Sequence, residues 1–210
     1  MRRKRLKKFD QKYLVVVSGP SGCGKDTVVM ELMHRRPDIE LAVSMTSRPK
    51  RDYEIEGSHY YFVSREEFER RISEGEMVEH TEYAGNYYGT PKKEIEEKLI
   101  NRQTVVLVIE FNGAKKIKEL YPGSLLVFIV PPSLEELERR LRLRDTEESW
   151  EVEKRLKIAE EELKHLADYD FVIENVKFRE CAKKLEDTID FWQNKKEEQH
   201  DNTRYGETYR

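Results

Sequence analysis

A glycine-rich segment near the start of the chain has the spacing of a loop that wraps phosphate groups. Its residues satisfy the pattern G-x-x-x-x-G-K and are Gly19, Pro20, Ser21, Gly22, Cys23, Gly24 and Lys25. Glycines at this spacing let successive backbone N–H groups turn inward, and the N-terminus of a following helix adds partial positive charge. The lysine can reach the β- and γ-phosphates. This segment, together with Asp26 and Thr27, is therefore predicted to hold the phosphates of ATP.

The residue after the lysine departs from the usual pattern. Ser or Thr is common there because the hydroxyl ligates Mg²⁺, whereas this chain has Asp26 followed by Thr27. A carboxylate can ligate Mg²⁺ directly or through water. Alternatively, the negative charge of Asp26 stabilises the first turn of the helix. Asp26 is thus a candidate metal ligand, with a capping role as the alternative.

A second group of residues has the chemistry of a site for a phosphorylated acceptor. Arg48 and Arg51 lie on either side of a proline, and paired guanidinium groups can hold one phosphate bidentately. The phenol of Tyr60 can complete such a site. The carboxylate of Glu79 can accept two hydrogen bonds from an N–H/NH₂ edge such as that of guanine. Taken singly, however, a glutamate on a polar strand is more often a solvated side chain.

The elements that must position these residues alternate along the chain. Apolar runs typical of strands buried on both faces cover residues 13–17, 104–109 and 125–130, and a short strand is expected over 170–173. Helices are expected over 27–35, 134–143, 151–166 and 179–192. This alternation predicts an α/β fold, a parallel sheet covered by helices. Residues from about 47 to 92, rich in Tyr, Glu and Arg, predict an insertion that presents polar side chains to a ligand.

Composition narrows the class of protein. The chain has 210 residues, which fits one domain. Charged residues make up 39% of it while the net charge is only −3, and such interspersed charges argue against a nucleic-acid-coating protein. No apolar run approaches the ~20 residues needed to span a bilayer. Two cysteines are too few for a disulfide framework, which favours the cytoplasm. A basic extension is expected over 1–12 and a disordered tail over 195–210.

In order and spacing, these motifs resemble the guanylate kinase family from residue 13 to residue 192. The matching segments are the phosphate loop G-P-S-G-C-G-K, then T-S-R-P-K-R, E-G-S-H-Y-Y-F-V, G-N-Y-Y-G-T-P and E-K-R-L. The resemblance implies a three-layer P-loop NTPase fold over 13–194. It also implies a mixed α+β insertion over about 47–92 that binds the nucleoside monophosphate, and a small LID over about 142–155.

The resemblance also implies roles for single residues. Arg48, Arg51, Tyr60 and Tyr88 would hold the acceptor phosphate, and Glu79, Ser44, Thr90 and Glu110 would contact the base. Arg144 and Arg155 would close over the transferred phosphoryl group together with Lys25, and Asn175 would lie near the adenine. The implied reaction transfers the γ-phosphoryl group of ATP, with Mg²⁺, to GMP or dGMP. The partners expected are small molecules, with no nucleic acid or membrane, and the protein would be a monomer or a homodimer.

Some positions depart from the family pattern. Val108 and Glu110 stand where an acid and an aspartate are usual, and Val176-Lys177 replace a pair of acids. One alternative is therefore a kinase of the same fold for another phosphorylated acceptor, such as ribose bisphosphate or another nucleoside monophosphate. A second alternative is a non-enzymatic phosphopeptide-binding module. The intact Lys25 argues against that second alternative, because such modules typically have a degraded phosphate loop.

Overall fold

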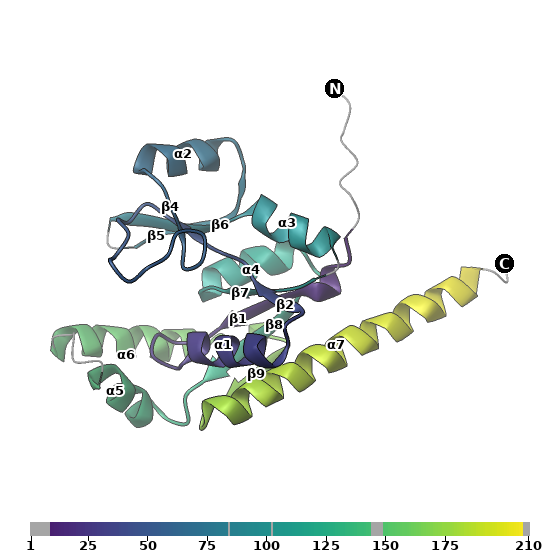
Figure 1. Ribbon diagram of the computed structural model, residues 1–210. Coiled ribbons are helices and arrows are strands. Elements are labelled where there is room, and N and C mark those ends of the chain that lie inside the picture. Colours follow the sequence, from purple (N-terminus) through teal and green to yellow (C-terminus); the bar gives the residue numbers. More distant parts are fainter. Residues whose placement is uncertain (1–8, 84, 102, 144–148, 208–210) are drawn as a thin grey trace.

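A parallel five-stranded sheet forms the centre of the protein (Figure 1). The structure is a computed structural model and describes residues 9–83, 85–101, 103–143 and 149–207. The strand order is β2-β7-β1-β8-β9, and all four pairings are parallel. The strands are β1 (Leu14–Ser18), β2 (Ile39–Leu41), β7 (Thr104–Val108), β8 (Leu125–Val130) and β9 (Phe171–Glu174). The predicted parallel α/β sheet is confirmed.

Helices cover both faces of this sheet because its central strands are apolar on both sides. Within β1, Val15 and Val17 pack in one core cluster with residues of α1 (Lys25–Arg35) and α7 (Phe178–Glu207). Leu14 and Val16 point the other way, as alternation along a strand requires, and pack with residues of α3 (Lys92–Ile100) and α4 (Phe111–Leu120). The result is the predicted three-layer arrangement.

A second, mixed sheet forms the predicted insertion. Its strand order is β4-β3-β6-β5, with β3 parallel to β4 and the other pairs antiparallel. Its elements are β3 (Met45–Thr46), β4 (Tyr61–Phe62), α2 (Arg65–Ser73), β5 (Met77–Tyr83) and β6 (Asn86–Pro91). Ser64 caps α2, since its hydroxyl accepts a hydrogen bond from the backbone N–H of Glu67. The fully buried Phe68 anchors the helix on the sheet.

Two helices stand beside the end of the main sheet that carries the glycine-rich loop. They are α5 (Leu134–Arg142) and α6 (Ser149–Leu163), and they share a small apolar cluster around Leu137 and Val152. Two short 3₁₀ turns, η1 (Gln11–Tyr13) and η2 (Leu166–Asp168), precede β1 and β9. The LID expected over about 142–155 falls here, and its residues 144–148, Arg144 among them, lie outside the described residues.

The end of the chain differs from the expectation of a disordered tail. Figure 1 shows α7 running past the sheet and away from the body, and this helix continues to Glu207. Low hydrophobicity limits packing against a core. It does not prevent helix formation, because Lys, Glu and Gln have good intrinsic helix propensity. Within the described residues, none of the helices is long and apolar enough to cross a membrane.

Candidate active site

The glycine-rich loop connects β1 to α1, in the middle of the sheet. Gly19 and Gly24 have positive φ values of 146° and 92°. A Cβ on Gly19 would lie 2.1 Å from the carbonyl oxygen of Ile129, and one on Gly24 would lie 2.6 Å from Nδ2 of Asn175. Both glycines are therefore required by backbone conformation and by space. The loop stays close against β8 and the chain after β9 as a result.

Lys25 begins α1 and folds back over its own loop. Its Nζ donates hydrogen bonds to the carbonyl oxygens of Gly19, at 2.5 Å, and Pro20, at 3.0 Å. These bonds hold the ammonium group in the concavity of the loop. A phosphate held by the loop amides would meet this positive charge directly.

Two side chains support the loop from behind. Nδ2 of Asn175 donates to the carbonyl oxygen of Cys23 at 2.7 Å, and Asn175 is 3% exposed. Arg140 donates to the same Cys23 oxygen at 3.4 Å and to the carbonyl oxygen of Asn175 at 3.0 Å. Cys23 is fully buried, and burial raises the pKa of its thiol. The sequence analysis missed Arg140, because it is one of several arginines on α5 with no distinguishing motif.

A cavity of about 670 Å³ opens on the outer side of the loop. Gly22, Gly24 and Thr27 line it together with Asn175 and residues 176–180. Asn175 is therefore at the wall of a cavity that adjoins the phosphate loop, where the resemblance places an asparagine near adenine.

A second cavity, of about 760 Å³, brings together most of the predicted acceptor residues. Its walls come from the loop before β3, the insertion strands and the segment that links β7 to α4. The predicted residues among its lining are Ser44, Tyr60, Glu79, Tyr88 and Glu110. The first and the last of these residues, Ser44 and Glu110, are 66 positions apart in the chain. The fold therefore assembles this site from separate segments.

Glu79 lies on the floor of the acceptor cavity. It is 7% exposed, and its Oε1 accepts a hydrogen bond of 2.8 Å from the hydroxyl of Thr90, which is fully buried. Burial raises the pKa of Glu79, while the Thr90 hydrogen bond and then the charge of Lys116 act in the opposite direction. A buried carboxylate that lines a cavity is suited to accept hydrogen bonds from a polar ligand edge.

Arg48 is held in place by a carboxylate that the sequence analysis missed. Its guanidinium makes a bidentate pair with Glu54, with N–O distances of 2.6 and 3.0 Å. The guanidinium also lies over the ring of Tyr60, 5.8 Å from the centroid. Arg48 lowers the pKa of Glu54 to about 2. No spacing rule separates Glu54 from its acidic neighbours Asp52 and Glu56, so only the fold identifies it.

Arg51 and the tyrosines complete this edge of the acceptor site. The backbone N–H of Arg51 donates to Glu54 at 2.7 Å, while its guanidinium donates to the hydroxyl of Tyr53 at 2.8 Å. Tyr60 and Tyr88 meet edge to face with ring centroids 6.0 Å apart. Burial raises the pKa of Tyr60, and the nearby Tyr88 and Asp26 contribute in the same direction. The structure thus brings Arg48, Tyr60 and Tyr88 together, with Arg51 at the margin.

The helix α6 places two charged side chains beside the phosphate loop. Arg155 donates to the hydroxyl of Ser21 at 3.3 Å. Glu162 is half-buried, and burial raises its pKa to about 7 although the charge of Lys25 opposes this. Within the described part of the chain, Oε2 of Glu162 is buried with no hydrogen-bond partner. Glu162 could not be identified from the sequence, because it is the last of three consecutive glutamates. Only its angular position around α6 distinguishes it from the other two.

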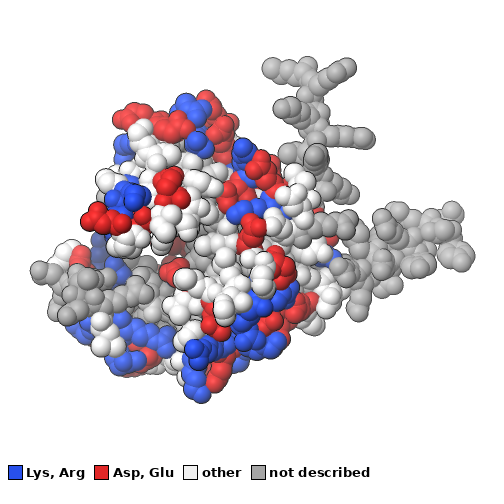
Figure 2. All heavy atoms as spheres, in the orientation of Figure 1, with Lys and Arg blue, Asp and Glu red and all other residues white. Residues whose placement is uncertain are grey.

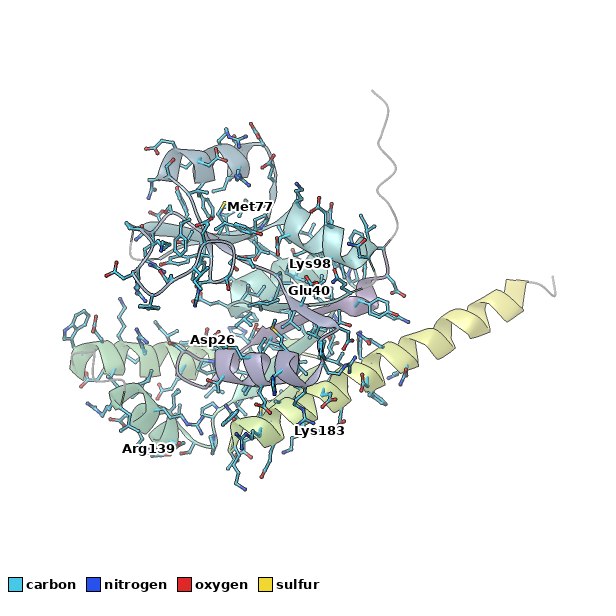
Figure 3. All side chains as sticks on the ribbon, in the orientation of Figure 1. Asp26, Glu40, Met77, Lys98, Arg139 and Lys183 are labelled. Atoms are coloured by element: carbon cyan, nitrogen blue, oxygen red, sulfur yellow. The ribbon has the colours of Figure 1, made fainter. Side chains whose placement is uncertain are left out.

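Asp26 stands where a metal shared with phosphates could bind. Figure 3 shows it at the N-terminal end of α1, next to the loop. Within the described residues, no three His, Cys, Asp or Glu side chains gather into a protein cage for a metal. Mg²⁺ commonly takes one or two carboxylates, substrate phosphates and waters instead. Asp26 therefore fits Mg²⁺ bound in that shared way.

A third cavity connects the loop region with the acceptor site. It has a volume of about 680 Å³, and Asp26 and Glu54 are among the residues that line it. It shares Ser44, Tyr60 and Val108 with the acceptor cavity. Figure 2 shows this face hollowed between the insertion and the body, with positive and negative side chains interspersed around it. The fold and site define a P-loop α/β protein with an acceptor site next to its phosphate loop.

Comparison with known proteins agrees with this class. The family model described as guanylate kinase matches residues 11–191. A guanylate kinase of Clostridioides difficile is 46% identical over 182 residues, covering 87% of this chain and 89% of that protein. A second, of Carboxydothermus hydrogenoformans, is 44% identical, covering 82% and 85%. The crystal structure of guanylate kinase from Anaplasma phagocytophilum matches with a TM-score of 0.67 at 38% identity, covering 84% and 82%. The chain belongs to the guanylate kinase family, as the resemblance implied.

Proposed function

We propose that this protein transfers the γ-phosphoryl group of ATP to GMP or dGMP, giving ADP and GDP or dGDP. The observation that carries the proposal is the continuity of the two sites. The cavity that is lined by Asp26, the residue directly after the phosphate loop, shares three wall residues with the cavity that Glu79 lines. A donor phosphate and an acceptor phosphate can therefore meet without leaving the protein.

The acceptor cavity suits a guanine base joined to a phosphate. The ionised carboxylate of Glu79 accepts hydrogen bonds from the guanine N1–H and N2 amine, and Thr90 fixes its orientation. Ser44 and Glu110 offer further polar groups on the same walls. At the other end, Arg48 is oriented by Glu54 before any ligand arrives, so little side-chain entropy is lost when it binds the acceptor phosphate. Arg51, Tyr60 and Tyr88 add donors there.

Catalysis in this site rests on position and charge. Phosphoryl transfer requires two phosphates in line, neutralised charge and little water. Lys25 neutralises the transferring group from the loop, and Arg155 adds charge from α6, with Arg144 in the same role. A bound Mg²⁺, held in part by Asp26, would supply further charge neutralisation. The acceptor phosphate is already ionised at neutral pH, so no general base is needed.

An acceptor screen tests the proposed reaction. ADP release is measured with ATP and Mg²⁺ against GMP, dGMP, AMP, CMP, UMP and ribose bisphosphate. GMP or dGMP should give the highest kcat/KM by a wide margin. A clear preference for ribose bisphosphate or another nucleotide would replace the proposal by a different acceptor. No turnover with any acceptor, together with phosphopeptide binding, would replace it by a binding module.

A loop variant tests the donor site. Lys25→Ala should lower kcat by at least about a hundredfold, because the charge removed acts mainly on the transferring phosphoryl group. Lys98→Ala is the control, since Lys98 is an ion-paired lysine on α3, remote from the loop. The far-ultraviolet circular dichroism of both variants should match that of the unchanged protein. Retained turnover in Lys25→Ala would contradict the assigned role.

A further inference from the structure

The base cavity has one wall that the family motifs do not describe, the face of α4. This helix packs across β5, the strand that carries Glu79. A Cβ placed on Gly113 would lie 3.2 Å from Oε2 of Glu79, so the backbone of α4 lies directly against the carboxylate. Lys116 is three residues further along, on the same side of the helix as Gly113. Lys116 and Glu79 line the same cavity.

The charges around Glu79 make Lys116 distinctive. Burial disfavours the ionised form of Glu79, and after the Thr90 hydrogen bond the largest opposing influence is the charge of Lys116. The negative charge of Glu110 raises the pKa of Glu79, as burial does. Burial lowers the pKa of the adjacent His80, and the charge of Lys116 acts in the same direction. The remaining titratable side chains that line this cavity are Tyr60, Tyr88, Lys115 and Glu119.

We propose that Lys116 is a positioning residue for base recognition, whose ammonium group keeps the Glu79 carboxylate ionised in its buried site. This inference rests on the proposed function and assigns part of the base specificity to α4. The ionised carboxylate only accepts hydrogen bonds, whereas the protonated form also donates one. A guanine edge presents two donors, N1–H and the N2 amine, so it is matched by the ionised form alone.

The proposal predicts an effect that depends on pH and on the base. Removing the charge of Lys116 should raise the pKa of Glu79. As the pH falls, the carboxylate of the variant then gains its proton, and loses its match to guanine, at a higher pH than in the unchanged protein. AMP presents a hydrogen-bond acceptor at N1 instead of an N1–H donor, and the protonated form of Glu79 matches that edge, so use of AMP should not fall when Glu79 gains a proton. AMP also carries the same 5′-phosphate as GMP, which corrects for protonation of the phosphate near pH 6.

The main experiment compares Lys116→Met with the unchanged protein. KM and kcat for GMP are measured from pH 5.5 to 8 at low ionic strength, with AMP in parallel. The acidic limb of kcat/KM for GMP should move to higher pH in Lys116→Met. KM for GMP should rise about two- to fivefold at the acidic end, the size expected of an exposed charge, with little change in kcat. Lys116→Arg should restore the original profile, and 1 M salt should bring the profiles together because it screens exposed charges.

Lys115→Met is the matched control. It removes the same charge from the next residue of the same helix, which projects about 100° away around the axis. Its acidic limb should move less than that of Lys116→Met. Superimposable GMP profiles for Lys116→Met and the unchanged protein would overturn the proposal. Equal shifts in the two methionine variants, or equal shifts with GMP and AMP, would also overturn it in favour of a general charge effect.

A second measurement separates this inference from the proposed function. The carboxyl ¹³C resonance of Glu79 can be titrated by NMR in the ligand-free protein, without any acceptor. Its midpoint should be higher in Lys116→Met than in Lys115→Met. An unchanged midpoint refutes the role of Lys116 even if GMP is the preferred acceptor. A raised midpoint with another preferred acceptor refutes the proposed function alone.

Discussion

The buried carboxylate of Glu162 offers a quantitative test of the electrostatics around the phosphate loop. Burial raises the pKa of this group from 4.5 to about 7, and Oε2 has no hydrogen-bond partner in the described part of the protein. An acid whose pKa is raised on folding binds a proton more tightly in the folded than in the unfolded chain. Ionising it therefore lowers stability, and Glu162→Gln should remove that penalty.

The size and sign follow from proton linkage. Below about pH 4.5 Glu162 is protonated in both states, so the glutamine variant and the unchanged protein should have similar stability. Between about pH 4.5 and 7 the unfolded state loses its proton first, and the unchanged protein becomes progressively less stable than the variant. The full pKa difference corresponds to ~3 kcal/mol. Because solvent reaches part of the side chain, we expect ~1–2 kcal/mol above pH 7.

Urea unfolding of the ligand-free protein measures this difference. Midpoints are compared at pH 4.5, 6 and 8 for Glu162→Gln and for Glu160→Gln, which removes an exposed carboxylate from the same helix. Glu162→Gln should gain stability only toward alkaline pH, and Glu160→Gln should follow the unchanged protein throughout. A stability difference that does not change with pH, or a loss at pH 8, would refute the proposed cost of ionising Glu162.

Two further predictions concern residues that hold others in place. Glu54→Gln removes the charged partner of Arg48, so KM for GMP should rise about tenfold while KM for ATP stays unchanged. Asp52→Asn is the control for Glu54→Gln. Equal increases in KM for GMP and for ATP would contradict the role of Glu54 as the residue that orients Arg48. Arg140→Met removes two hydrogen bonds at the phosphate loop, and it should raise KM for ATP severalfold and lower the free energy of unfolding by ~1–2 kcal/mol. Thermal unfolding measures the change in the free energy of unfolding. A larger increase in KM for GMP than in KM for ATP would contradict the role assigned to Arg140.

Features carried by contiguous residues were predictable from the sequence. The phosphate loop is one segment with a fixed pattern, and the strand β8 is a continuous apolar run whose predicted bounds agree with the structure. The helix α4 was not predicted. Gly113, in its first turns, weakens the helical pattern, and the structure shows that a Cβ at this position would crowd the carboxylate of Glu79.

Partnerships between distant residues were not predictable in the same way. Any of several acids could have paired with Arg48, and any of several arginines on α5 could have reached the loop. The fold selects Glu54 and Arg140 because only their positions bring the side chains within hydrogen-bond distance. The helical continuation after Lys195 was missed for another reason, since weak hydrophobicity was treated as a sign of irregular backbone.

The separation of the two sheets has a consequence for how such a protein can change. The insertion leaves the body after β2 and returns at α3, and its sheet shares no strand with the main one. Substitutions on β6, and on β5 away from Val78, can therefore alter the acceptor cavity while the core around β1 keeps its packing, whereas Val78 itself packs in that core. The helix α4 likewise contributes both to the main core and to the wall of the base cavity. A new acceptor preference would evolve most freely from the insertion, whereas changes at Gly113 would be constrained by folding as well as by recognition.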